Sequence, residues 1–291
     1  MSDVAARVRG LAVLSVAAGT TVIGLYVIFV RLPIGQRWDD RALLGGLLAS
    51  EEARKALTAA LHGIRISTLI LMVAVILVIG LARRRLLVAL VATAAFAGAI
   101  VSAEVLKRVL PRRDLAPELN AYVDKGNIDT FPSGHSTIAM GFALALILVT
   151  SPRYRAPVAF FAMVWAAAVP MATLAAGWHR PSDVLGGMAL ALAFVSGAAA
   201  VLTHLDGRVG PTPSSMRSLP VTGVAVIAVC VAVLLLWIGT GDASAIPIGG
   251  GFAAFTLAEV AIALVAVVSL GVYARSLRGL SFDRAQASAD D

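Results

Sequence analysis

Three short stretches of this sequence concentrate residues that could do chemistry. They are "LKRVLPRRD" at 106–114, "DTFPSGHST" at 129–137 and "GWHRPSDVLGG" at 177–187. Each lies at the end of a long apolar run and brings a different polar group: clustered cations, a Ser-Gly-His turn, and a histidine followed by an aspartate. Groups of these three kinds together suit the binding and transfer of an oxyanion.

The third stretch pairs a histidine with a carboxylate. His179 and Asp183 are four positions apart, and Pro181 between them is typical of the first turn of a helix. In that geometry we expect Asp183 to accept a hydrogen bond from His179 Nδ1–H. The bond would fix the imidazole tautomer and leave Nε2 as a nucleophile or a base.

The second stretch predicts an anion site at a helix start. Ser133 can cap the helix that follows, and the first backbone N–H groups then point outward. Gly134 lets an oxyanion approach the backbone closely, because it has no side chain. His135 would lie in the first turn and face the same place.

The first stretch supplies positive charge through Lys107, Arg108, Arg112 and Arg113. Snorkelling at a helix end is an alternative explanation of such a cluster. Taken with the other two stretches, however, these cations indicate a phosphate site, since phosphate needs spread positive charge and N–H donors.

A metal site is the rival interpretation of the same residues. His135, His179 and Asp183 are groups that zinc accepts as ligands. The surrounding Lys and Arg side chains would repel a cation, so the sequence favours phosphate chemistry without a metal or other cofactor.

The order Lys-x4-Arg, Pro-Ser-Gly-His and His-x3-Asp resembles the type 2 phosphatidic acid phosphatase superfamily over roughly residues 60–205. This superfamily includes lipid phosphate phosphatases, polyprenyl-diphosphate phosphatases and the vanadium haloperoxidases. The resemblance implies that His179 attacks phosphorus to form a phosphohistidine, that Asp183 orients it, and that His135 protonates the leaving alcohol and then activates water. It also implies a phosphate cradle of Lys107, Arg112, Ser133 and Gly134, with Arg113 as a further candidate.

Two positions depart from the family pattern. The arginine expected seven residues after Lys107 is Asp114, which leaves Arg112 or Arg113 to act in its place. The Ser-Arg pair expected before the nucleophile is Ala172-Thr173. One arginine that would clamp the phosphate is therefore missing at Thr173, and Arg113 and Arg180 are the available substitutes.

The elements that position these stretches are predicted to be membrane helices. The chain has 291 residues, of which 59% are hydrophobic and only 14% are charged, and a soluble domain carries about 25% charged residues. The apolar runs are continuous, which favours an all-α polytopic helical bundle over a barrel. Predicted spans are 11–30, 65–82, 86–106, 135–150, 156–177, 183–203, 219–239 and 252–273.

We predict a six-helix phosphatase core over residues 1–210 and two additional C-terminal transmembrane helices over 211–280. Residues 281–291 are predicted to be a disordered tail. Segment 36–63 is too polar to span and predicts either an interfacial helix or an ordinary external loop helix. Glu259 within the last span is left without an assigned role.

Glu104, near the end of the third span, is predicted to pair with Lys107 or Arg108 one helical turn on. Cys230 lies inside an apolar run, where packing or lipid contact explains it.

Tight basic loops predict the orientation. The loops at 82–86, 151–155 and 204–218 and the N-terminal residues Arg7 and Arg9 all fall on one side. Such loops stay in the cytoplasm, so we predict an integral protein of the cell membrane with both termini cytoplasmic and the active site extracytoplasmic.

The leading hypothesis is a membrane phosphatase that removes a terminal phosphate from a lipid or polyprenyl (di)phosphate reaching the site from the bilayer. The net charge of +7 is explained by membrane topology and does not indicate nucleic acid. A transporter or lipid-binding protein with a non-catalytic anion site is the alternative. A haloperoxidase is disfavoured because those relatives are soluble.

Overall fold

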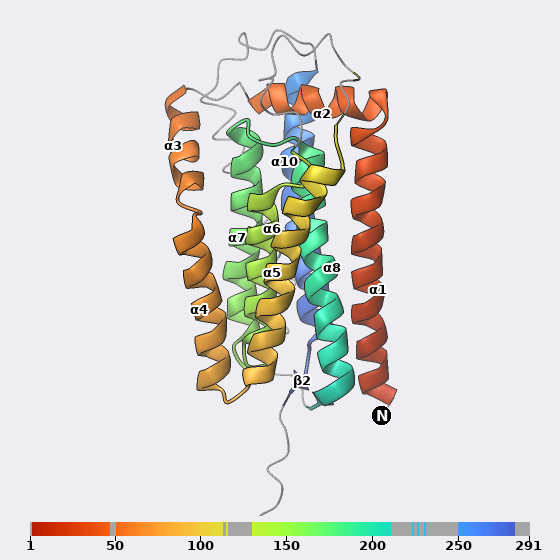
Figure 1. Cartoon of the computed structure of the whole chain (residues 1–291), viewed down its shortest axis with the longest axis vertical. Coiled ribbons are helices and arrows are strands. Elements are labelled where there is room, and N and C mark those ends of the chain that lie inside the picture. Colours follow the sequence, from red (N-terminus) through yellow and green to blue (C-terminus); the bar gives the residue numbers. More distant parts are fainter. Residues whose placement is uncertain are drawn as a thin grey trace, which may run out of the picture.

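A computed structural model shows an elongated bundle of helices (Figure 1). It describes residues 2–46, 51–112, 115, 130–210, 223, 226, 230 and 250–282. Helices account for nearly all of the secondary structure in these residues, and the predicted all-α polytopic membrane bundle is confirmed. The helices are α1 Ser2–Leu25, continued by the π-helical turn η1 Tyr26–Val30, α2 Pro33–Gly45, α3 Glu51–His62, α4 Ile66–Ala82, α5 Leu86–Val109, α6 Gly134–Val149, α7 Arg155–Ala175, α8 Pro181–Asp206 and α10 Gly251–Ser276.

Most of the predicted spans coincide with these helices to within a few residues. Within the described part of the chain, five helical segments have the length and apolar composition to cross a membrane: α1 with η1, α5, α7, α8 and α10. Helices α3 and α4 are bent by 56° at their break and together pass the same test. Helix α6 has 16 residues, and the predicted span 219–239 lies outside the described residues except for 223, 226 and 230.

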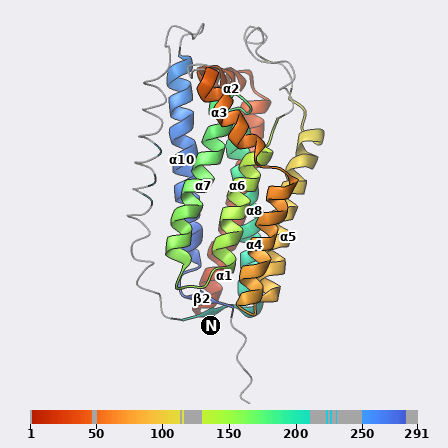
Figure 2. The ribbon, with the colours of Figure 1, turned by 90° about the vertical axis from the view of Figure 1, so that its left-hand side faces the viewer.

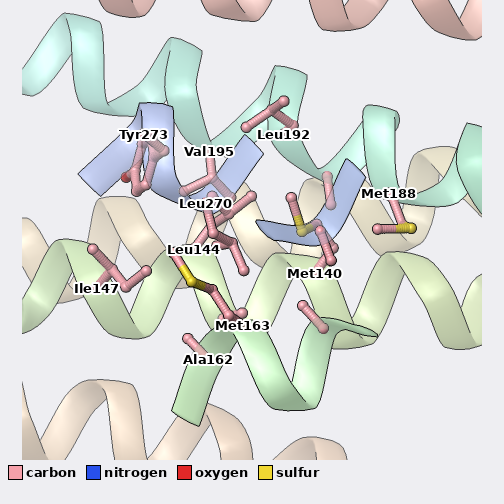
Figure 3. Close-up of a cluster of buried hydrophobic side chains, with 14 of the residues drawn as sticks. Met140, Leu144, Ile147, Ala162, Met163, Met188, Leu192, Val195, Leu270 and Tyr273 are labelled. Atoms are coloured by element: carbon pink, nitrogen blue, oxygen red, sulfur yellow. The ribbon is translucent and has the colours of Figure 1, made fainter. Parts of the chain in front are cut away.

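Helix α6 runs through the centre of the bundle, between α7 on one side and α4 and α5 on the other (Figure 2). Its side chains are buried on almost every face, as expected for a helix that is apolar all round. Figure 3 shows side chains of α6, α7, α8 and α10 converging on one core. Contributors include Met140 and Leu144 of α6, Met163 of α7, Leu192 of α8, and Leu270 and Tyr273 of α10.

Helix α10 is therefore packed into the same core as the motif-bearing helices. It contacts α2, α7 and α8. Gly45 of α2 allows a close approach to α10, because a side chain there would collide with the backbone of Gly251 and with Phe255. The division of the chain at residue 210 stays a prediction.

The two ends of the bundle carry different parts of the sequence. Helix α1 begins at one end, where the loops 83–85 and 151–154 and the short antiparallel pair β1 Arg208–Val209 and β2 Leu280–Ser281 also lie (Figures 1 and 2). Helix α2 lies across the opposite end, together with the end of α5 and the beginnings of α6 and α8 (Figure 1). The described residues of all three candidate stretches thus lie at the end that α2 covers. Segment 36–63, predicted as one interfacial or loop helix, forms parts of both α2 and α3.

Candidate active site

The beginning of α6 has the predicted capped geometry. Ser133 is the N-cap residue, and its hydroxyl accepts a hydrogen bond from the backbone N–H of Ser136 at 3.3 Å. The backbone N–H of Ser133 donates to the carbonyl of Asp183 at 2.8 Å, which joins the second stretch to the third. The N–H groups of Gly134 and His135 begin the helix and so have no intrahelical carbonyl to bind.

Lys107 reaches this helix start from α5. Its Nζ lies 2.7 Å from Glu104 Oε1, which confirms the predicted ion pair one turn apart. Both atoms lie against Gly134, where a β-carbon would stand 3.2 Å from each. A lysine ammonium and the first amides of α6 therefore face the same small space.

The structure places His179 beside Asp183 without the hydrogen bond that the sequence predicted. His179 Nδ1 lies 3.8 Å from Asp183 Oδ2, which is too long for a hydrogen bond. Two other donors occupy that oxygen: the hydroxyl of Thr130, and the backbone N–H of Arg180 at 3.1 Å. Among the described residues, the buried His179 Nδ1 has no hydrogen-bond partner. The two side chains therefore lie close together without a direct hydrogen bond.

Arg112 touches the same aspartate from the other side. Its Nη2 donates to Asp183 Oδ1 at 3.0 Å and lies 3.3 Å from Asp39 Oδ2. Burial alone would lower the pKa of Arg112, but the charges of Asp183 and Asp39 outweigh it and raise the pKa. The predicted phosphate ligand Arg112 is thus a permanently charged bridge between two buried carboxyl groups.

Comparison with known families agrees with this arrangement. Residues 84–206 match the family model described as PAP2 superfamily. This segment belongs to the PAP2 superfamily. It covers α5, α6, α7 and α8 and contains all three candidate stretches. No curated protein and no solved structure matches the chain. Membership indicates a membrane phosphatase that acts on phosphate esters.

Helix α2, which precedes the PAP2 segment, supplies two acidic residues that sequence reasoning missed. Asp39 accepts hydrogen bonds from the backbone N–H of Ser182 at 2.9 Å and from its hydroxyl at 2.6 Å. Asp40 accepts from Arg180 Nε. Burial raises the pKa of Asp39 to about 6 against the lowering effect of Arg112. The adjacent aspartates in "RWDDR" are the sequence feature that could have indicated this contact. Acidic residues that become buried require cationic or hydrogen-bonding partners elsewhere in the chain.

Arg180, one of the two predicted substitutes for the family arginine, is therefore held by α2. Arg113, the other, lies outside the described residues. Thr173, which stands where the family has arginine, is buried and donates its hydroxyl to the carbonyl of Pro170 at 2.7 Å. Its own carbonyl accepts from the backbone N–H groups of Trp178 and His179, so this residue shapes the loop that presents the histidine.

Trp178 is a further neighbour of the candidate site that the sequence did not single out. Its ring lies edge-on to His135, with centroids 5.3 Å apart, and 4.9 Å from the ring of His62. Because His62 belongs to α3, the indole links α3 to the candidate acid of α6. The aromatic contact on His135 restrains its orientation in the first turn of the helix.

In the residues that the structure describes, no three or more His, Cys, Asp or Glu side chains gather as a metal-binding group. Asp183, one of the three residues considered for zinc, has its two carboxyl oxygens occupied by the side chain of Arg112 and by the backbone N–H of Arg180. This donor set fits an anion better than a divalent cation.

Proposed function

We propose that this protein is a lipid phosphatase that removes the terminal phosphate of a lipid or polyprenyl (di)phosphate through a phosphohistidine intermediate. One observation carries the proposal: the backbone of Ser133 is bonded to that of Asp183, so the anion-binding start of α6 and the His179–Asp183 pair share one place. The site lies at the end of a bundle of membrane-length helices, where a substrate anchored in the bilayer can reach it.

The reaction proceeds in two displacements. His179 Nε2 attacks phosphorus, the bond from phosphorus to the alcohol oxygen breaks, and His135 donates a proton to that oxygen. His135 then takes a proton from water, whose oxygen attacks phosphorus. The bond from phosphorus to His179 Nε2 breaks, which releases inorganic phosphate and restores the imidazole. Asp183, 3.8 Å from His179 Nδ1, stabilises the positive charge that the imidazole acquires.

Phosphate is held by the start of α6 and by α5. The free N–H groups of Gly134 and His135 bind the phosphoryl oxygens, aided by the partial positive charge at the helix N-terminus. Lys107 lies at the same place and exchanges its contact with the half-exposed Glu104 for one with the phosphate dianion. Arg112 acts indirectly, by fixing Asp183.

A non-catalytic anionic-lipid-binding or transport protein is the second candidate. The observation in its favour is that Lys107, Arg112 and Arg180 each have a carboxylate partner. These carboxylates partly neutralise the three cations, which leaves less positive charge to stabilise the transition state of phosphoryl transfer. Turnover separates the two candidates, because the second binds lipid phosphates without releasing phosphate.

The purified protein is expected to release phosphate from phosphatidic acid or a polyprenyl phosphate in the presence of EDTA, and vanadate is expected to inhibit it. Vanadate adopts the five-coordinate geometry of the phosphoryl transition state and so binds tightly to sites built for it. Phosphate release with each lipid, with and without chelator, is the measurement. Loss of activity in EDTA that a divalent ion restores would support the zinc interpretation, and binding without release would support the second candidate.

The active site is expected to face the outside of the cell. The basic loop at 83–85 lies at the opposite end of the bundle from α2, and short basic loops stay in the cytoplasm. Arg41→Cys on α2 and Arg84→Cys, each on a Cys230→Ala background, place one exposed thiol at either end. An impermeant thiol reagent should label position 41 but not position 84 in intact cells. Labelling at 84 alone would reverse the orientation.

A further inference from the structure

An apolar cavity of about 470 Å³ lies between α3, α7 and α10, and Val226 and Cys230 also line it. This volume is within the range of small-molecule sites, about 300–1,000 Å³. Its walls include Leu57 and Leu61 of α3, Trp165 and Ala172 of α7, and Phe255 and Glu259 of α10. Helices α3 and α10 lie outside the segment that matches the PAP2 superfamily and α7 lies inside it, so the cavity forms where that segment meets the rest of the chain.

Glu259 brings a carboxyl group into this otherwise apolar lining. It is 1% exposed, and neither of its carboxyl oxygens has a hydrogen-bond partner among the described residues. The buried Nε1 of Trp165, which lines the same cavity, likewise has no partner there. A buried carboxyl without a partner costs several kcal/mol on general grounds, so its retention in an apolar wall points to a ligand that satisfies it.

The cavity lies next to the candidate active site. Leu61 of its wall packs in one hydrophobic cluster with Trp178, whose ring contacts the ring of His135 at 5.3 Å. Ala60 and Ala168 line the cavity and are exposed, so it opens at the side of the bundle. We expect that surface to face lipid, because α7 and α10 have the length and apolar composition of membrane spans. An apolar chain can therefore enter sideways while its phosphate occupies the start of α6.

We propose that this cavity binds the apolar chain of the substrate and that Glu259 selects chains carrying a hydroxyl or amide group. Such a group donates a hydrogen bond to the Glu259 carboxyl, whereas a plain hydrocarbon or isoprenoid chain leaves it unsatisfied. A hydroxyl also accepts a hydrogen bond, as the indole N–H of Trp165 requires. The inference rests on the proposed phosphatase function. It specifies the preferred substrates of the enzyme as phosphates of hydroxylated or amide-containing lipids.

Filling the cavity tests the first half of the proposal. Ala168→Trp, at the mouth of the cavity, is expected to lower kcat/KM for long-chain alkyl phosphates by about 10-fold or more. Phenyl phosphate has no chain, so its hydrolysis should stay within about twofold of wild type. The matched control is Val268→Trp on the exposed face of α10. It should leave kcat/KM unchanged for both substrates. Equal losses for both substrates, or no loss for either, would overturn the assignment of the cavity.

Glu259 is tested with matched substrates. A series of alkyl phosphates of one length, with a single hydroxyl moved along the chain, is compared with the unsubstituted chain. Wild type should prefer one hydroxyl position by about fivefold, the value of one hydrogen bond. Glu259→Leu should bring the hydroxylated and plain chains to equal kcat/KM, whereas Glu259→Gln, which keeps hydrogen-bonding capacity, should retain part of the preference.

The outcomes separate this inference from the function on which it rests. A hydroxyl preference that survives in Glu259→Leu, or that is absent from wild type, would refute the role of Glu259. If wild type released phosphate from none of the substrates, phenyl phosphate included, the phosphatase function itself would be refuted.

Discussion

His179→Ala is expected to lower phosphate release by about 10³-fold or more while the protein still folds. The substitution removes the atom that attacks phosphorus, and His179 is the histidine that lies beside Asp183, at 3.8 Å, in the described residues. The His179 side chain is 11% exposed and its Nδ1 has no hydrogen-bond partner in the described residues, so its removal breaks no hydrogen bond of that atom and the protein is expected to fold. Initial rates with a lipid phosphate, together with the melting temperature in detergent, provide the measurement.

His204→Ala is the matched control for that result. His204 is an exposed histidine in the last turn of α8, at the far end of the same helix that carries Asp183. Its removal should leave the rate unchanged. Activity of His179→Ala within about threefold of this control would show that His179 is not the nucleophile.

Local signals explain which features could be predicted from the sequence. The predicted spans 86–106 and 183–203 lie inside α5 and α8, because continuous apolar runs end at Arg-rich or Pro-containing loops. Ser133 as a cap and Pro181 at the start of α8 follow from the chemistry of adjacent residues alone. The order of three motifs was sufficient to indicate the PAP2 superfamily.

Long-range pairing explains what the sequence could not reveal. Asp39 reaches Arg112 and Ser182 across more than 70 positions, and apolar periodicity carries no information about such partners. The same limit applies to Asp183, whose Oδ2 is occupied by Thr130 rather than by His179 Nδ1. The cavity around Glu259 requires α3, α7 and α10 to be assembled before it exists.

Arg112→Met is expected to lower both stability and turnover, and adding Asp39→Asn is expected to restore only the stability. The guanidinium of Arg112 offsets the charges of two buried carboxyl groups, at 3.0 Å from Asp183 and 3.3 Å from Asp39. Removing one partner of a buried pair costs about 3–5 kcal/mol, because the other charge is left unpaired. Turnover should fall by about 10-fold or more, since Asp183 loses the contact that fixes it beside His179.

The loss of stability should also depend on pH. The pKa of Asp39 is raised from 3.8 to about 6, so the folded protein binds this proton more readily than the unfolded chain. Stability contributed by Asp39 is therefore greatest in acid and falls as pH rises from about 4 through 6. Arg112 opposes this rise in the pKa, so without it the fall should be larger and extend to higher pH. Melting temperatures of Arg112→Met and wild type should differ less at pH 5 than at pH 8.

The double variant decides how Arg112 acts. In Asp39→Asn/Arg112→Met the uncompensated charge at position 39 is gone, so the melting temperature should recover towards that of Asp39→Asn. Asp183 still lacks its arginine, so turnover should stay low. Arg41→Met on the exposed face of α2 is the control for loss of a cation nearby. Recovery of turnover together with stability would show that Arg112 serves only to neutralise Asp39, and that Thr130 and the backbone of Arg180 suffice to hold Asp183 for catalysis.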